Sequence, residues 1–193
     1  RFVAMLVLLL SFLGSAFAAD HAVILMYHRF GENRLPSTNI RLDQFDAHLE
    51  KLSNGNYSVW PLAKIVDHLQ KNMPLPDRTV AITIDDAYLS VFTEAWPRLQ
   101  AKGFPFTIFV ATDLVGRPGG RYLSWEELKA MKAEGAEIAN HSTGHQHWAR
   151  QPDNTSLEAW SDEFLQDTLR AQEILQTQLG FAPKHYALPY GEY

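Results

Sequence analysis

The stretch TVAITIDD, from Thr79 to Asp86, decides the fold of this chain. Its first six residues are apolar or β-branched without a break, which is typical of a strand buried on both faces of a parallel sheet. The strand runs into two adjacent carboxylates instead of a turn residue. Two like charges at the end of an apolar strand are unfavourable unless a cation lies against them. Because no basic run follows the pair, a metal ion is its natural counter-charge.

The segment HSTGH, from His141 to His145, supplies neutral imidazoles, which together with carboxylates bind a borderline cation such as zinc. The chain has no cysteine, so any metal must be held by His, Asp or Glu. A His-x-x-x-His spacing is weak evidence alone, because eight histidines in 193 residues produce such pairs by chance. With the acid pair it forms a set of one carboxylate and two imidazoles with a spare acid, which is typical of a hydrolytic metal site.

Length and composition indicate one globular domain. The chain has 193 residues, of which 12% are aromatic and 20% are charged, and this is enough to bury a sizeable core. Its net charge of −5, without a basic patch or an arginine-rich helix, argues against nucleic acid as a partner. We find no internal repeat, low-complexity segment or interdomain linker. The sequence does not indicate an oligomeric state.

The N-terminal segment is typical of a secretory signal peptide. Arg1 precedes an apolar run from Phe2 to Leu13, and residues 15–18 end in the small-x-small pattern of a cleavage site. We expect residues 1–18 to be a signal peptide that is incomplete at its start, and the mature protein to be periplasmic or extracellular with no stable membrane span. The alternative is an uncleaved anchor, although the apolar run is short for a bilayer-spanning helix.

Apolar runs and helical repeats alternate along the rest of the chain. Strands are expected at residues 22–27, 57–59, 79–84, 106–111, 136–140 and 185–189. Helices are expected at residues 42–52, 62–69, 88–101, 124–135 and 157–179. Pro97 either kinks the third helix or starts a new one. This alternation predicts an α/β fold with parallel pairing, either barrel-like or doubly wound.

Several polar residues follow the expected strands directly. In a parallel barrel the functional groups collect at the carboxyl ends of the strands. Asp85, Asp86, His141 and Tyr190 all fall at such ends, so we expect them to lie on one rim. His28 follows the first strand and either borders the same pocket or is an ordinary buried histidine.

Three ordered motifs resemble those of the polysaccharide deacetylases, carbohydrate esterase family four with its NodB homology domain. They are TIDD at residues 83–86, HSTGH at residues 141–145 and LPYG at residues 188–191. Residues 25–30 and 59–62 are similar to the exported branch that includes poly-N-acetylglucosamine deacetylases. The resemblance covers nearly the whole chain after residue 18. It implies a distorted (β/α) barrel, which we expect to be incomplete, with residues 19–193 as a catalytic domain truncated at its C-terminus.

The resemblance also implies roles for individual residues. Asp86, His141 and His145 would bind a divalent metal ion, expected to be zinc, which polarises the acetyl carbonyl and lowers the pKa of water. Asp85 would take the proton of the attacking water as general base. The backbone N–H of Tyr190 would help to hold the developing oxyanion.

Other positions of the motifs shape or support the site. Leu188 and Pro189 would form the wall of the groove that receives the sugar, and Ser142 or Thr143 would hydrogen-bond within the ligand loop. Ala187 stands where many family members carry an Arg that orients the catalytic Asp, so the general base is either held by another group or less well tuned. The later family motifs, which supply a His as general acid, have no counterpart in this sequence.

The implied activity is metal-dependent hydrolysis of N-acetyl groups from an amino-sugar polysaccharide of the N-acetylglucosamine type, with release of acetate. Two alternatives stay open: a hydrolase of a non-sugar amide on the same fold, and a glycan-binding pseudoenzyme, suggested by Ala187 and the missing acid. The purely structural alternative is that Asp85 and Asp86 lie ahead of Tyr88 as N-cap residues of the helix that begins there.

Aromatic and imidazole side chains outside the motifs have less specific expectations. Trp125, Trp148 and Trp160 either offer a face on which sugars stack or pack in the core and at its rim. His147 and His185 are expected on the surface.

Overall fold

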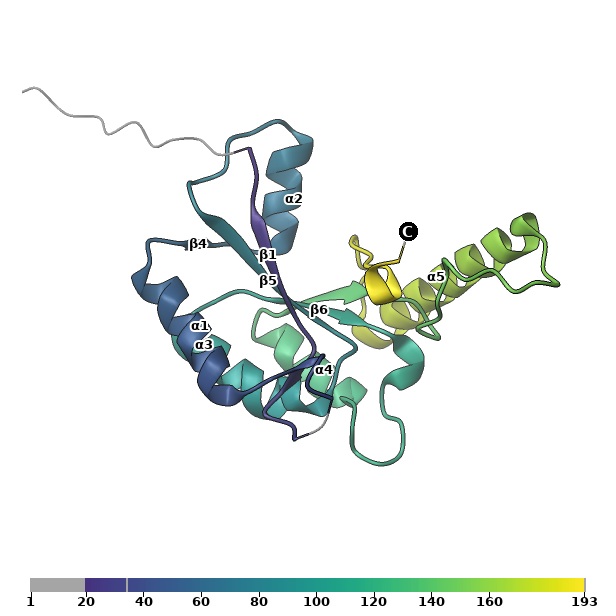
Figure 1. Cartoon of the computed structure of the whole chain (residues 1–193), viewed down its shortest axis with the longest axis horizontal. Coiled ribbons are helices and arrows are strands. Elements are labelled where there is room, and N and C mark those ends of the chain that lie inside the picture. Colours follow the sequence, from purple (N-terminus) through teal and green to yellow (C-terminus); the bar gives the residue numbers. More distant parts are fainter. Residues whose placement is uncertain (1–19, 34, 193) are drawn as a thin grey trace, which may run out of the picture.

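The fold is mixed α/β around a parallel sheet, seen in a computed structural model that describes residues 20–33 and 35–192 (Figure 1). The predicted signal peptide therefore lies outside the described residues. The strands are β1 Val23–Tyr27, β2 Arg29–Phe30, β3 Asn39–Ile40, β4 Ser58–Val59, β5 Thr79–Asp85, β6 Thr107–Val110 and β7 Glu137–Asn140. The α-helices are α1 Leu42–Asn54, α2 Leu62–Gln70, α3 Trp96–Lys102, α4 Trp125–Ala133 and α5 Leu157–Leu179. Shorter helical turns are the π-helix η1 Val91–Ala95 and the 3₁₀-helices η2 Thr112–Leu114 and η3 Pro189–Gly191.

Strand β5 is the centre of the sheet. It pairs in parallel with β1, β4 and β6, and β6 pairs in parallel with β7. The described strands form the open path β1-β5-β6-β7, with β4 beside β5, so the described part of the chain does not close into a barrel. All residues of β5 are buried, which confirms that this stretch is a strand covered on both faces.

The two faces of β5 enter two apolar clusters, because successive side chains of a strand point to opposite sides. Val80, Ile82 and Ile84 belong to the larger cluster, which also takes buried side chains from α1, α3, α4 and α5. Ala81 belongs to the smaller cluster, with side chains of α2, β6 and β7. In Figure 1, α1 and α3 lie side by side and α2 lies beside β1 and β5. Packing on both faces fixes the register of β5 and therefore the place where its terminal acids emerge.

The region after β5 confirms the helix expected at residues 88–101, since helical residues run without a break from Leu89 to Lys102. A π-helix at Val91–Ala95 precedes α3, and Pro97 lies in the first turn of α3. Proline lacks an N–H and interrupts the regular helical hydrogen bonding, and the π-helical segment lies directly before it. Pro97 therefore lies within a continuous helical run and does not begin a separate helix.

The expected last strand at residues 185–189 is also reduced in the structure. Tyr186 forms an isolated parallel bridge with Asn140, and Pro189 already begins η3. Because Pro189 has no N–H to donate to a strand ladder, the chain turns away from β7 at this point. The pair β2 and β3, each of two residues, was not expected at all.

A capping box starts α4, which precedes β7 and the histidine loop. Ser124 Oγ accepts a hydrogen bond from Glu127 N at 3.2 Å, and Glu127 Oε2 accepts one from Ser124 N at 2.7 Å. We expect Ser124→Ala to lower the free energy of unfolding by about 1 kcal/mol, because it leaves a helix N–H unpaired. Urea denaturation measures this loss. The control Ser124→Thr keeps the hydroxyl and should lose less; equal stability of Ser124→Ala and the unchanged protein would contradict the capping role.

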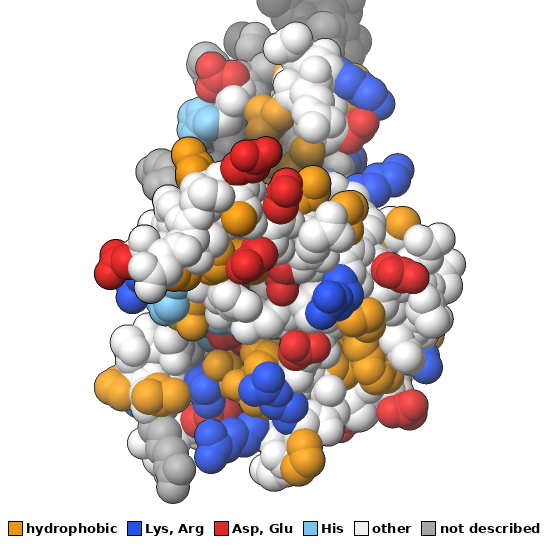
Figure 2. Space-filling view, turned by 90° about the vertical axis from the view of Figure 1, so that its right-hand side faces the viewer, with side chains coloured by type: hydrophobic (Ala, Val, Ile, Leu, Met, Phe, Trp, Pro, Cys, Tyr) orange, Lys and Arg blue, Asp and Glu red, His pale blue; other side chains and the backbone are white. Residues whose placement is uncertain are grey.

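Helix α5 packs mainly through its C-terminal half, where Ala171, Leu175 and Leu179 are buried. Figure 1 shows the N-terminal half of α5 extending away from the sheet. On the face that carries this helix, acidic, basic and hydrophobic side chains are interspersed (Figure 2). Within residues 20–33 and 35–192, no helix has the length and apolar character that crossing a bilayer requires.

Candidate functional site

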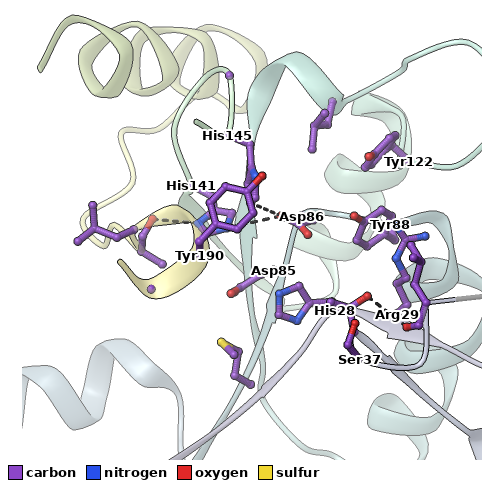
Figure 3. A pocket seen from close by; sticks show the side chains of 18 residues that line it. His28, Arg29, Ser37, Asp85, Asp86, Tyr88, Tyr122, His141, His145 and Tyr190 are labelled. Carbon is purple, nitrogen blue, oxygen red and sulfur yellow. Dashed lines mark hydrogen bonds and ion pairs between the residues drawn. The ribbon is translucent and has the colours of Figure 1, made fainter. Parts of the chain in front are cut away.

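The candidate site lies at the carboxyl ends of β1, β5 and β7, where side chains from distant segments meet (Figure 3). Asp85 ends β5 and Asp86 follows it, while His141 directly follows β7. Together with His145 and Tyr190 they line a pocket of about 740 Å³. The residues expected on one rim are thus brought together in space.

Three side chains are arranged as a possible metal-binding group. One ligand atom from each of Asp86, His141 and His145 lies within 4.8 Å of the others. Asp86 Oδ1 is 2.8 Å from His145 Nε2 and 3.5 Å from His141 Nε2. His141 Nδ1 donates a hydrogen bond to the Ala187 carbonyl oxygen at 2.9 Å, so in neutral imidazole Nε2 carries the free lone pair.

The chemistry of this group fits a divalent cation. Asp86 Oδ1 is buried without a hydrogen-bond partner of suitable geometry in the described part of the chain. A buried carboxylate oxygen left in this way is costly, and a cation among it and the two imidazoles removes the cost. Burial lowers the pKa of His141 to about 4, which keeps its imidazole neutral and able to coordinate. Burial alone would raise the pKa of Asp86, but the neighbouring imidazoles outweigh it and lower that pKa.

Asp85 is a second acid beside the group and is not one of its members. Its residue is 7% exposed. Burial, and then the charge of Asp86, raise the pKa of Asp85 to about 7. No side chain of the described residues hydrogen-bonds to its carboxylate, and Ala187 lines the same pocket. The Asp85 carboxylate is therefore free to face a ligand, and among residues 20–33 and 35–192 no side chain takes the place of the expected Arg.

The loop that carries the two histidines is held by a hydrogen bond within the loop and by others to α5. Ser142 Oγ accepts a hydrogen bond from His145 N at 2.9 Å. Thr143 Oγ1 donates to the Asp167 carbonyl oxygen at 2.7 Å, and the Asp167 carboxylate accepts from Thr143 N and Gly144 N at 2.8 and 3.1 Å. Asp167 was missed by the sequence reasoning, because one polar residue in a long helix carries no signal of a partner 24 positions away.

Left-handed backbone is concentrated at the site. Nine non-glycine residues have positive φ in the described part of the chain, and five of them belong to the segments that carry the acid pair, the two histidines and Tyr190. These five are Asp86, Ala87, Ser142, His145 and Tyr190. Such conformations are costly and persist only where the surroundings impose them. They also show that the N-cap alternative for the acid pair is wrong, because Asp85 ends β5, a left-handed turn at Asp86 and Ala87 follows, and helical residues begin only at Leu89.

Of the remaining residues expected at the site, some line the pocket and others do not. His28 lines the pocket, and Figure 3 shows its imidazole on the side of the acid pair. Leu188 also lines the pocket, whereas Pro189 is buried and does not belong to the lining. The Tyr190 ring packs 4.6 Å from the ring of His145. Burial lowers the pKa of His28, although the charge of Asp86 opposes this shift.

The tryptophans and the other two histidines lie elsewhere. Trp148 and Trp160 pack on each other at 4.8 Å, and neither they nor Trp125 line the pocket. His147 and His185 lie at the surface as expected, but they are only partly exposed, with 35% and 18% of their side chains accessible. Each donates from Nδ1 to a carboxylate, that of Glu192 or that of Glu137, at 3.0 and 2.7 Å respectively.

The wall opposite the histidines was not foreseen. Tyr88 and Tyr122 stack at 4.9 Å, and the Arg29 guanidinium lies 3.6 Å from the centre of the Tyr88 ring. Arg29 also forms an ion pair with Glu32 at 2.9 Å. This cation lines the pocket but is engaged with its own partners, so it does not neutralise the acid pair.

Comparisons with known proteins agree on one family. The family model described as polysaccharide deacetylase matches residues 72–193. The chain is 28% identical over 122 residues to the protein YxkH of Bacillus subtilis (strain 168). The aligned region is 63% of this chain and 42% of YxkH. It is 22% identical over 175 residues to the poly-beta-1,6-N-acetyl-D-glucosamine N-deacetylase of Escherichia coli (strain K12). Here the aligned region is 73% of this chain and 26% of that protein.

A solved structure shares the fold over most of its length. IcaB from Ammonifex degensii superimposes with a TM-score of 0.78 and 29% identity, covering 90% of this chain and 76% of that chain. This chain spans less than half the length of the two curated relatives, at 42% and 26%. The family model nevertheless covers more than half of this chain and includes all three motifs with their acid pair, histidines and Tyr190. The chain therefore belongs to the polysaccharide deacetylase family.

Proposed function

We propose that this protein hydrolyses N-acetyl groups of an amino-sugar polysaccharide of the N-acetylglucosamine type, releasing acetate and a free amine. The observation that carries the proposal is the Asp86, His141 and His145 group beside a free, buried Asp85 carboxylate in an open pocket. The Escherichia coli relative is named a poly-beta-1,6-N-acetyl-D-glucosamine N-deacetylase, which supports the choice of substrate class.

Asp86, His141 and His145 would hold the divalent ion, for which zinc suits a set of one carboxylate and two imidazoles. When bound, the ion polarises the amide carbonyl and lowers the pKa of water. A carboxylate oxygen of Asp85 takes the proton of the water that attacks the carbonyl carbon. The backbone N–H of Tyr190 donates to the oxyanion that develops there. Breaking the C–N bond then yields acetate and requires a proton at the leaving nitrogen.

His28 is the group that would supply this proton. It lines the pocket, and it is the one imidazole of the described lining that does not belong to the proposed metal ligands. Leu188 would support the sugar ring, and the loop bonds of Ser142 and Thr143 would keep the two ligand imidazoles in place. Pro189 would not contact the sugar; it would start the turn that carries Tyr190.

We expect His28→Asn to lower kcat about 10²-fold, because general acid catalysis by a positioned side chain contributes this much or more. Acetate release at saturating substrate measures the effect, and bound metal per chain should stay unchanged. His21→Asn is the matched control, since the His21 side chain is 81% exposed and remote from the pocket lining. An unchanged kcat in His28→Asn would mean that water or another group protonates the amine.

The direct test of the proposed function is acetate release from N-acetylglucosamine oligomers. We expect release by the protein loaded with zinc, loss of release in the presence of a chelator, and recovery when zinc is added back. Cyclic ureides and simple acetamides serve as comparison substrates, and preference for them would support a non-sugar amidase. Oligomer binding without acetate release would support the glycan-binding alternative.

The proposed site of action is outside the cytoplasm, in the periplasm or the extracellular space. The support is the signal-like pattern at residues 1–18, which precedes the described part of the chain. N-terminal sequencing of the mature protein tests this point, and the expected new terminus is Ala19.

A further inference from the structure

Three aromatic rings stand in a row at the edge of the site. The Tyr190 ring lies between His145, at 4.6 Å and 67°, and His147, at 3.5 Å and 11°. The first contact is edge-to-face and the second is a parallel stack. Figure 3 shows the Tyr190 ring close to His145, in agreement with this contact. His147 has no part in the chemistry proposed above, yet it is in closest contact with the residue that carries the proposed oxyanion donor.

His147 is itself held in place by the segment that follows Tyr190. Its Nδ1 donates to Glu192 Oε2 at 3.0 Å, and Arg150 pairs with the other oxygen of the same carboxylate at 2.7 Å. At the other end of the segment, the Ala187 carbonyl accepts from His141. The stretch from Ala187 to Glu192 is therefore fastened at both ends to the loop that carries the proposed metal ligands.

The Tyr190 turn needs such support. Tyr190 has φ 62° and ψ 0°, a left-handed conformation that is unfavourable for a residue with a side chain. The residue is largely exposed, at 54%, so burial in a core does not impose this conformation. Within the turn, one hydrogen bond from Gly191 N to the Leu188 carbonyl oxygen at 3.1 Å closes the chain. Two ring contacts join the strained residue to the ligand loop: the edge-to-face contact with His145 and the closer, parallel stack on His147.

We propose that His147 is a positioning residue, whose stacked ring holds the Tyr190 turn in the orientation that its backbone N–H needs for catalysis. This inference rests on the proposed function. The stack depends on a flat ring at position 147, whereas the ion pair of Arg150 with Glu192 only supplements it. A phenyl ring should therefore replace the imidazole, and loss of Arg150 should matter little.

The kinetic test compares three variants for acetate release and metal content. His147→Ala should lower kcat by about 10- to 100-fold, the cost of a catalytic group displaced by around an ångström, with KM and bound metal unchanged. His147→Phe should keep kcat within about threefold of the unchanged protein, because it preserves the stack. Arg150→Ala, the matched control, should do the same. Unchanged kcat in His147→Ala, an equal loss in His147→Phe, or loss of metal in His147→Ala would each overturn the inference.

A second measurement does not depend on catalysis. Chymotrypsin cleaves after exposed tyrosines, so the rate of cleavage between Tyr190 and Gly191, followed by mass spectrometry, reports how firmly the turn is held. This rate should rise in His147→Ala and stay low in His147→Phe, and equal rates in all variants would overturn the inference. If the unchanged protein released no acetate, the proposed function would fail, while this comparison would still decide whether the stack holds the turn.

Discussion

Replacing Asp85 by Asn is expected to stop turnover while leaving the metal ion bound. Asn has nearly the shape of Asp but cannot accept a proton, and Asp85 lies beside the Asp86, His141 and His145 group without belonging to it. General base catalysis typically contributes up to about 10⁴-fold, and we expect a loss of about 10³- to 10⁴-fold in kcat. Acetate release and metal analysis on the same preparation measure the two halves of this prediction.

The Asp85→Asn experiment has a control in the neighbouring turn. Asp113 in η2 is exposed, and Asp113→Asn removes one negative charge without touching the pocket lining. Its kcat should match that of the unchanged protein. If Asp85→Asn retained most of its activity, another group would have to be the base. If it lost its metal, Asp85 would have to be a ligand. Either result would contradict the role of general base assigned to Asp85.

The centre of the fold and the core of the site could be predicted from the sequence because their signals are local. The β-branched and apolar run at residues 79–84 is typical of a buried strand, and parallel strands bring the residues after Asp85 and Asn140 to the same edge. The capping box at Ser124 and the glycine after Leu179 likewise mark helix ends within a few residues.

The parts that could not be predicted depend on contacts between distant segments. The hydrogen bonds of Asp167 to the histidine loop join α5 to a segment more than twenty residues away, and no pattern in either segment announces them. The His147 stack on Tyr190 is similar, since one flanking histidine gives no sign of its partner. The residues after His185 look like a strand by composition, but only Tyr186 pairs before Pro189 ends the pairing. The local sequence pattern determines where helices and strands lie, whereas contacts between distant segments determine which side chains surround a ligand.

Replacing Asp86 by Ala is expected to abolish metal retention and with it all acetate release. Asp86 is the one carboxylate of the three-residue group, and its Oδ1 faces both imidazoles. Two neutral imidazoles alone bind a divalent ion weakly, because no negative charge remains in the group and a ligand is missing. Metal analysis after gel filtration should find about one ion per chain in the unchanged protein and none in the variant.

Stability gives this prediction a readout that does not need substrate. A ligand that binds only the folded protein raises its free energy of unfolding by about 4 kcal/mol at a thousandfold excess over Kd. The unchanged protein should show such a gain when zinc is added to the metal-free form, and Asp86→Ala should show none. Asp162→Ala, on α5 and outside the group, should keep the full gain. A variant without Asp86 that still gained stability from zinc and released acetate would place the ion elsewhere, and the convergence of the acid pair with the two histidines would then have another cause.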